Sequence, residues 1–312
     1  MKTLLRRSFF ITFGIVLISI VLLGCSFASE ETGTLKLSLT DAPIADSAAV
    51  EGVYITISSI WYNQNDVWIE DTNFEGPQTF NLLDLTGGTV AALSNTEITA
   101  GEVTQIRFML NVEEEGTAGE GTPGSYIVLD STGTADGTET NDVIHELFVP
   151  SGAQTGYKAT GSFTIPANGE VEITADFDVR KSVVKRGVKD EYILKPTIRL
   201  VVNNQAGTIA GSFAEGTSTY PSFIIFAYED GEYAASEAAE VTGDEIQFEH
   251  AISSASVDLT EGSYTIPFLA KGTYDLIIVG VDEEGVYTVI DETTYSDVVV
   301  ESELTTDQNI NL

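Results

Sequence analysis

The chain of 312 residues contains one cysteine and two histidines, and both scarcities narrow the chemistry open to it. Cys25 has no partner for an intramolecular disulfide. A zinc site built from cysteine and histidine ligands would lack ligands. His145 and His250 are the only histidine bases, and neither lies near a nucleophile-elbow pattern. We therefore expect no catalytic residues and no bound cofactor other than calcium, which is considered below.

Basic residues are also scarce, with 14 Lys and Arg against 48 Asp and Glu and a net charge of −34. Nucleic acid is not an expected partner, because phosphate binding requires clustered Lys and Arg. The same charge argues against a chain that lies flat on an anionic bilayer, and its simplest role is solubility. Hydrophobic residues make up 43% of the chain, which argues for a packed core and against disorder.

Long apolar runs are missing except for one near the N-terminus. Lys2, Arg6 and Arg7 precede a mostly apolar stretch from Phe9 to Leu23. This order is typical of a secretory signal peptide, and the stretch is shorter than the ~20 residues that span a bilayer. The paired arginines also resemble a twin-arginine motif, so the export route stays open.

The apolar stretch ends in Leu22-Leu23-Gly24-Cys25, which resembles a lipobox. We therefore expect residues 1–24 to be a cleaved lipoprotein signal peptide. Residues 25–32 would be a lipidated cysteine and a spacer, with palmitate or a related acyl chain on Cys25. The protein would thus be exported and held on a membrane by lipid. Ser26 follows the cysteine instead of the Asp that resembles an inner-membrane retention signal, which favours the outer membrane.

The rest of the chain has the periodicity of strands. In Thr34–Thr40, leucines alternate with polar residues, as in a half-buried strand. No segment shows a sustained apolar stripe at helical spacing, and the one helical turn that we expect is Val90–Leu93. The clearest further strands are expected at 53–58, 106–110, 126–129, 171–177, 198–202, 222–228, 263–268, 273–281 and 287–290.

A boundary between two modules is expected near Asn203–Gly207. Of the residues from 207 to 312, one is basic (Lys271) and 21 are acidic, so the two parts differ in charge. We predict an all-β fold with two β-sandwich modules, Ig-like or transthyretin-like, at 33–203 and 207–312.

Several motifs of the first module resemble one family. They are Thr40-Asp41-Ala42-Pro43, Ala100-Gly101, Gln105-Ile106-Arg107, Val149–Lys158, Asp176–Val183 and Leu194–Arg199. In this order they are similar to the domain of unknown function 4382. The resemblance implies a bacterial lipoprotein of β-sandwich type, and it implies no activity.

The second module has a motif of its own at Pro267–Leu276. This segment resembles a corner of the transthyretin-like or carboxypeptidase-regulatory-like β-sandwiches. In such a corner Gly272 would adopt a turn conformation and Tyr274 would pack inward at the start of the next strand.

An acidic loop between residues 130 and 142 is the best candidate for a metal site. Asp130, Asp136, Glu139 and Asp142 offer the hard oxygen ligands that calcium prefers. Their spacing does not follow the EF-hand pattern. A calcium site and a solvated loop therefore both remain open.

Basic residues gather between Arg180 and Arg199 and have two interpretations. They pair with the surrounding carboxylates, as surface charges commonly do. Alternatively, Lys158, Lys181 and Lys195, which lie in the family-like motifs, converge on an anionic ligand such as an acidic glycan. Trp61 and Trp68 are likewise either sugar-stacking or core residues.

Taken together, these features predict a non-catalytic cell-envelope lipoprotein that binds a glycan or an envelope protein. Two alternatives stay open. One is a glycan hydrolase, or an accessory to one, that uses paired carboxylates, although 48 acidic residues make chance pairs abundant. The other is a structural spacer that displays the acidic second module.

Overall fold

The computed structural model of the chain describes residues 31–42, 50–110, 124–129, 143–149, 156–185, 192–217, 220–241, 246–283 and 285–312. The signal-peptide residues, Cys25 and the calcium candidates Asp130, Asp136, Glu139 and Asp142 lie outside the described residues, so their roles stay predictions. Thr32–Leu312 form one compact unit. In the described ranges, no helix is both long and apolar enough to cross a membrane.

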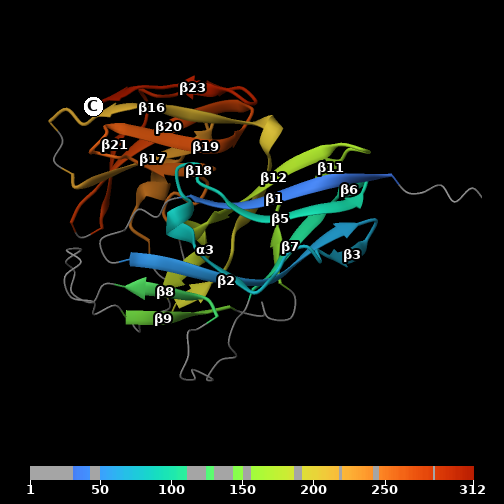
Figure 1. The fold of residues 1–312 in the computed structure, drawn as a ribbon. Coiled ribbons are helices and arrows are strands. Elements are labelled where there is room, and N and C mark those ends of the chain that lie inside the picture. The colour runs from blue at the N-terminus through green and yellow to red at the C-terminus, as the bar shows by residue number, and fades with distance from the viewer. Residues whose placement is uncertain are drawn as a thin grey trace, which may run out of the picture. The chain divides into compact units, whose positions relative to one another are not determined.

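Strands dominate the described residues, which confirms the all-β fold class (Figure 1). We use "N-terminal module" for β1–β15 and "C-terminal module" for β16–β24. No strand of one module pairs with a strand of the other among the described residues, and each module has its own buried clusters. The boundaries predicted at 33–203 and 207–312 stay predictions.

The N-terminal module is built from two larger sheets and one pair of strands. The first sheet has the order β15-β12-β1-β5 and contains β1 (Thr32–Ala42), β5 (Ala91–Thr99), β12 (Glu170–Asp178) and β15 (Ile198–Val202). The second has the order β10-β7-β2-β8-β9-β14-β13, with β3 and β4 also paired to β2. Its strands are β2 (Val50–Gln64), β3 (Val67–Glu70), β4 (Gln78–Asn81), β7 (Gln105–Leu110), β8 (Tyr126–Leu129), β9 (Val143–Phe148), β10 (Tyr157–Ala159), β13 (Val183–Lys185) and β14 (Tyr192–Leu194). The separate pair is β6 (Gly101–Val103) with β11 (Phe163–Ile165).

Alternation along β1 builds the core of this module. Leu35, Leu37 and Leu39 are almost fully buried, whereas the residues between them are partly exposed. In the parallel pairing of β1 with β12, Leu37 lies opposite Ile173, which is also buried. Because side chains alternate across a strand, this register directs a continuous apolar face towards the second sheet.

The helical turn expected at Val90–Leu93 is wrong, because Ala91–Leu93 begin strand β5. Val90–Leu93 is a short apolar run without polar alternation, and such a run fits a strand as well as a helix. Antiparallel pairing with β1 decides the outcome, since Ala91 lies opposite Leu39. The helical turn instead precedes it, at η1 (Leu82–Leu85), where the Asn81 side chain accepts a hydrogen bond from the Leu83 N–H.

The C-terminal module also contains two sheets. One contains β16 (Ala206–Ala214), β19 (Ser263–Ala270), β23 (Thr305–Asp307) and β24 (Ile310–Asn311). The other contains β17 (Ser222–Glu229), β18 (Ser253–Ser256), β20 (Gly272–Val281), β21 (Tyr287–Asp291) and β22 (Val298–Val300). The described helical turns outside η1 are α3 (Val179–Ser182), η2 (Asn203–Gln205) and η3 (Ala235–Ala238).

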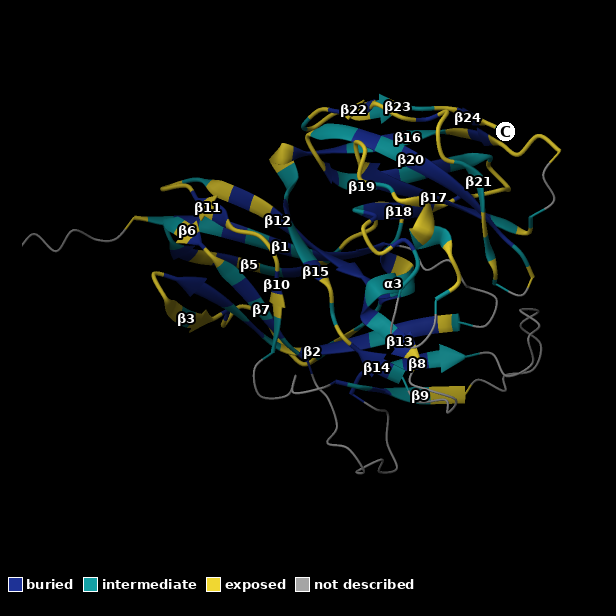
Figure 2. Cartoon of the chain, turned by 180° about the vertical axis from the view of Figure 1, so that it is seen from behind, coloured by how far each residue is buried: buried dark blue, intermediate teal, exposed yellow. Residues whose placement is uncertain are grey.

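The central strands β17 and β20 are buried on both faces, as their dark colour in Figure 2 shows. In β17, Phe223 and Ile225 belong to the cluster between the two sheets, whereas Ile224 and Phe226 belong to a second cluster on the opposite face. The second cluster is closed by Phe248, whose ring stacks on Phe226 with centroids 4.3 Å apart. The segment that carries Phe248 therefore covers a sheet face that would otherwise be solvated.

Candidate functional site

The one-turn helix α3 presents two basic side chains to the C-terminal module. It begins directly after β12, and Asp178 at the end of β12 is its N-cap, with Oδ1 accepting a hydrogen bond from the Lys181 N–H at 3.2 Å. Arg180 Nη1 donates to the carbonyl oxygens of Gln247 (2.9 Å) and Phe248 (2.7 Å). α3 thus contacts the segment that closes the second apolar cluster of the C-terminal module.

Two further basic residues make the same kind of contact. Lys181 Nζ donates to the Ala251 carbonyl oxygen at 2.7 Å, and Arg199 Nη1 in β15 donates to the Phe268 carbonyl oxygen at 2.9 Å. We call Arg180, Lys181 and Arg199 the junction cations. All three come from the family-like motifs, and all three donate to backbone carbonyls of the C-terminal module.

Carboxylates of β12 hold the junction cations in place. Asp178 Oδ2 lies 3.3 Å from Arg180 Nη2 and 3.4 Å from Lys181 Nζ, and Asp176 is paired with Arg199. The Arg180 and Asp178 side chains are only 6% and 10% exposed. Their pairing belongs to the interior and is not an exchangeable surface contact.

Asp41 on β1 adds a third carboxyl group to this cluster. It is buried, and its Oδ1 accepts a hydrogen bond from the Val179 N–H at 2.9 Å. Its Oδ2 has no hydrogen-bond partner within the described part of the chain. Burial raises the pKa of Asp41 well above its ordinary value, and the nearby carboxylates of Asp178 and Asp176 add to this shift.

The three lysines that the sequence suggested as one anion site lie on different elements. Lys181 lies in the junction, where burial lowers its pKa against the opposing effect of Asp178. Lys195 is exposed, and its N–H donates to the Ser182 carbonyl oxygen at the end of α3. Lys158 is exposed in β10, at the opposite end of the strand order from β13 and β14. Their convergence on a ligand stays a prediction.

Lys158 instead belongs to a row of side chains on the outer face of the second sheet. In the strand registers, Lys158 of β10 lies opposite Arg107 of β7, Arg107 opposite Trp61 of β2, and Trp61 opposite Glu70 of β3. These residues alternate with buried ones such as Ile106, so they point away from the core. Figure 2 shows β3, at one end of this row, mostly in the colour of exposed residues.

Both tryptophans lie on this face and outside the buried cluster of the module. The Arg107 guanidinium lies over the Trp68 ring at 3.9 Å from its centroid, and Trp61 Nε1 donates to Ser59 Oγ at 3.0 Å. Further along β2, Tyr54 stacks on Tyr126 of β8 with centroids 4.6 Å apart. We call Tyr54, Trp61, Trp68, Tyr126, Arg107 and Lys158 the aromatic face.

Arg107 was not singled out as a site residue by the sequence alone, although a signal for it was present. In Ile106-Arg107-Phe108-Met109-Leu110 the alternation places Arg107 on the side opposite three apolar residues. Its position beside Trp68 depends on the pairing of β2 with both β7 and β3, which joins segments far apart in the chain. That pairing is not readable from local periodicity.

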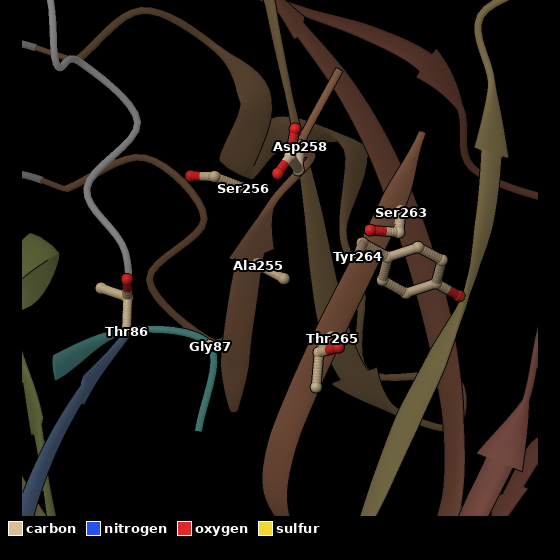
Figure 3. A pocket seen from close by; sticks show the side chains of 8 residues that line it. All are labelled: Thr86, Gly87, Ala255, Ser256, Asp258, Ser263, Tyr264 and Thr265. Carbon is tan, nitrogen blue, oxygen red and sulfur yellow. The ribbon is translucent and has the colours of Figure 1, made fainter. Parts of the chain in front are cut away.

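A small hollow shown in Figure 3 is lined by both modules. Thr86 and Gly87, which follow η1, face Ser256, Asp258 and Tyr264 across a volume of about 180 Å³. Ligand pockets are typically ~300–1,000 Å³, so this volume is small for an organic substrate. The Asp258 carboxylate is already used in its own turn, because its Oδ1 accepts the N–H groups of Thr260 and Glu261.

A larger hollow of about 410 Å³ bears on the hydrolase alternative, because it is lined by two carboxylates, Glu102 and Glu170. Both residues are exposed, and Glu170 Oε1 lies 2.7 Å from Lys36 Nζ.

The histidines have structural surroundings in separate modules. The His145 ring lies 5.4 Å from the Tyr192 ring, and His250 is 70% exposed with Nδ1 3.1 Å from Glu237 Oε1. Within the described ranges, no three His, Cys, Asp or Glu side chains gather as metal ligands would.

Comparison with known families gives one match. The model of the domain of unknown function DUF4382 matches residues 32–196, which is more than half of the chain. The matched range includes Arg180, Lys181 and Lys195. No match was found among the curated proteins.

Comparison with solved structures gives several distant likenesses. A leucine-rich repeat protein from Bacteroides thetaiotaomicron is 11% identical, with 90% of this chain and 26% of that chain covered and a TM-score of 0.22. The major pilin subunit BcpA of Bacillus cereus is 12% identical, with 90% and 70% covered and a TM-score of 0.21. A fimbrial protein from Bacteroides ovatus is 10% identical, with 91% and 51% covered and a TM-score of 0.19. The chain spans about a quarter of the first and about half of the last, and TM-scores this low carry no argument about function.

Proposed function

The chain belongs to the DUF4382 family, and from the geometry of its N-terminal module and the lipobox-like sequence before Cys25 we propose that it is a non-catalytic, lipid-anchored envelope protein that binds a glycan. The observation that carries this proposal is the aromatic face. Both tryptophans of the chain lie on the outer side of one sheet, beside Arg107 and Lys158 and away from the core.

The chemistry of a sugar ring fits such a face. One side of a pyranose ring presents mainly C–H groups, and the electron-rich face of an indole or phenol attracts them. Tyr54 and Trp61 are seven residues apart on β2, and a bulge between Ile57 and Ser59 places them on the same face. At ~3.3 Å per residue they lie at most ~23 Å apart. A strip of this length suits several linked sugars better than one small molecule.

The anchor part of the proposal rests on the sequence around Cys25. A lipid on this cysteine would hold the exported chain on a membrane, with residues 25–32 as a short tether, and Ser26 favours the outer membrane. Radiolabelled palmitate fed to the producing cells should label the wild-type chain and not Cys25→Ser. Equal labelling of the two chains would refute the anchor.

The binding part is tested with the secreted form of the chain, in which Cys25→Ser removes the lipid. A glycan array should show at least one class of polysaccharide that binds, and Trp61→Ala should weaken this binding at least tenfold, because it removes a stacking ring. Lys271→Ala, a change on the C-terminal module, is the control and should bind as the parent does. Absence of binding to every glycan, or full binding by Trp61→Ala, would contradict the proposal.

A carboxylate-based hydrolase is the second candidate, and the shared hollow of Glu102 and Glu170 is the observation behind it. The same array distinguishes it, because a hydrolase releases soluble fragments from the polysaccharides that it binds. Loss of fragment release in Glu102→Gln would favour this candidate.

A further inference from the structure

We propose that the aromatic face binds an anionic polysaccharide, with Lys158 and Arg107 receiving a sugar carboxylate while Trp61 stacks on the sugar ring. This inference rests on the proposed function and names the class of glycan. The argument starts from charge. A chain with a net charge of −34 places two cations side by side on this face, in the register pair Lys158–Arg107.

Lys158 and Arg107 form no ion pair with another described residue, whereas the junction cations do. Arg180, Lys181 and Arg199 each pair with an aspartate and donate to a backbone carbonyl. No described carboxylate lies within salt-bridge distance of Lys158 or Arg107. The Nε atom of Arg107 is buried and has no hydrogen-bond partner in that same part of the chain.

Stacking fixes the guanidinium of Arg107 before any ligand arrives. Its carbon lies 3.9 Å from the centroid of Trp68, so the planar group is held against the indole. A guanidinium held in one orientation loses less conformational entropy when it binds a carboxylate with two parallel hydrogen bonds. Arg107 is thus prepared to receive a planar anion.

The order of charges across the row predicts the orientation of a bound sugar. Lys158 and Arg107 lie on β10 and β7, whereas Glu70 lies at the other end of the row on β3, beyond Trp61. A sugar stacked on Trp61 places its carboxylate towards β7, because Glu70 repels it from β3. A neutral sugar has no charge for this order of residues to orient.

The test uses the lipid-free Cys25→Ser chain and three carboxylated polymers: polygalacturonate, alginate and hyaluronan. Each is compared with its own carboxyl-reduced, neutral form by isothermal titration calorimetry in buffer containing EDTA, so that no calcium ion bridges polymer and protein. We expect at least one acidic polymer to bind at least tenfold more tightly than its reduced form, because charge-assisted bonds are lost on reduction. Raising NaCl from about 0.05 to about 0.5 M should weaken this binding alone.

Two variants test whether the preference for the acidic polymer depends on the aromatic face. Lys158→Ala should lower the affinity for the acidic polymer about tenfold and leave the reduced form unchanged. Lys271→Ala removes the same charge from the C-terminal module and should leave both affinities unchanged. Circular dichroism spectra that match the parent keep a folding defect from imitating the result.

The outcomes separate this inference from the proposed function. Equal binding of each acidic polymer and its reduced form, or binding of neutral glycans alone, overturns the anionic preference and leaves the glycan proposal standing. Unchanged acidic binding in Lys158→Ala overturns the placement of the carboxylate. Absence of binding to all six polymers and to the whole glycan array overturns both.

Discussion

At the scale of single residues, the buried carboxyl group of Asp41 makes the stability of the fold depend on pH. One of its oxygens accepts the Val179 N–H, and the other has no partner among the described residues. Its pKa is raised mainly by burial, so the folded chain holds the Asp41 proton more tightly than the unfolded chain does. The stability that this group contributes is therefore complete below its unfolded pKa of ~3.9 and is lost as pH rises towards its folded pKa.

Asp41→Asn should remove this pH dependence. The amide keeps an oxygen for the Val179 N–H and carries no charge to bury. We expect the variant to gain stability relative to the parent as pH rises above ~4, by about 1.4 kcal/mol for each unit of pKa shift removed. Urea unfolding at a series of pH values measures the difference, and a difference that is constant with pH would contradict the prediction.

Asp291 provides a matched control of opposite sign. Although burial works against it, hydrogen bonds from Thr294 and Thr293 lower the pKa of Asp291. Its contribution to stability is present above its unfolded pKa and lost as pH falls through its folded pKa. Asp291→Asn should therefore lose stability relative to the parent as pH rises from the lowered folded pKa to ~4, and the difference should stay constant above that pH.

At the scale of elements, the one-turn helix α3 carries side chains that hydrogen-bond to the C-terminal module. Arg180 bridges the Asp178 carboxylate and the carbonyl oxygens of Gln247 and Phe248, and its side chain is 6% exposed. Removing it leaves a buried carboxylate and two buried carbonyl groups with fewer partners. Breaking one side of such a pair typically costs ~3–5 kcal/mol.

We therefore expect Arg180→Ala to lower the free energy of unfolding by about 3 kcal/mol or more. Lys36→Ala is the control, because Lys36 makes exposed ion pairs with Glu170 and Glu172 at 2.7 and 3.3 Å. Exposed pairs contribute ~0–1 kcal/mol, so this control should be nearly neutral. Urea denaturation of both variants gives the comparison, and equal losses would show that the junction contributes no more than a surface contact.

Strand β16 gives a second prediction for an element, because its Gly211 lies against the C-terminal segment. A Cβ atom on Gly211 would lie 2.0 Å from the Gln308 carbonyl oxygen, which is backbone and cannot rotate away. Gly87 differs: it has a φ of +64° and open space around its missing Cβ. Gly211→Ala should therefore cost several kcal/mol, and Gly87→Ala about 1 kcal/mol from backbone strain alone. Thermal unfolding ranks them, and the reverse order would contradict the register of β16 with β23 and β24.

The elements also show what local sequence can and cannot predict. Alternation found β1, β7 and β12 because their apolar residues face a core on one side only. It failed at Val90–Leu93, where an unbroken apolar run has no periodicity and pairing with β1 decides the structure. The basic residues of α3 were visible, but their contacts with Gln247, Phe248 and Ala251 join segments about 70 residues apart, as the separations of 67, 68 and 70 show.

At the scale of the whole molecule, the two modules differ in how their charges are balanced. The N-terminal module has basic residues at the junction, on the aromatic face and in exposed pairs such as Lys36–Glu170, whereas the C-terminal module has Lys271 as its one basic residue. Lys271 Nζ lies 2.6 Å from Glu301 Oε2, and both side chains are exposed. Most carboxylates of the C-terminal module therefore repel one another without a neighbouring cation to offset them.

This self-repulsion makes stability depend on salt. Added NaCl shortens the Debye length from ~10 Å at 0.1 M towards ~3 Å at 1 M, so repulsion among surface carboxylates falls while the buried junction pairs are affected much less. We expect the unfolding temperature to rise by several degrees between about 0.05 and about 0.5 M NaCl. Lys271→Glu should steepen this rise, because it replaces a positive charge with a negative one in the most acidic part of the chain. Calorimetry with sucrose at matched osmolality separates charge screening from general solute effects. A flat or falling salt dependence would mean that the exposed pairs, not the repulsion among unpaired carboxylates, dominate the electrostatics of the surface.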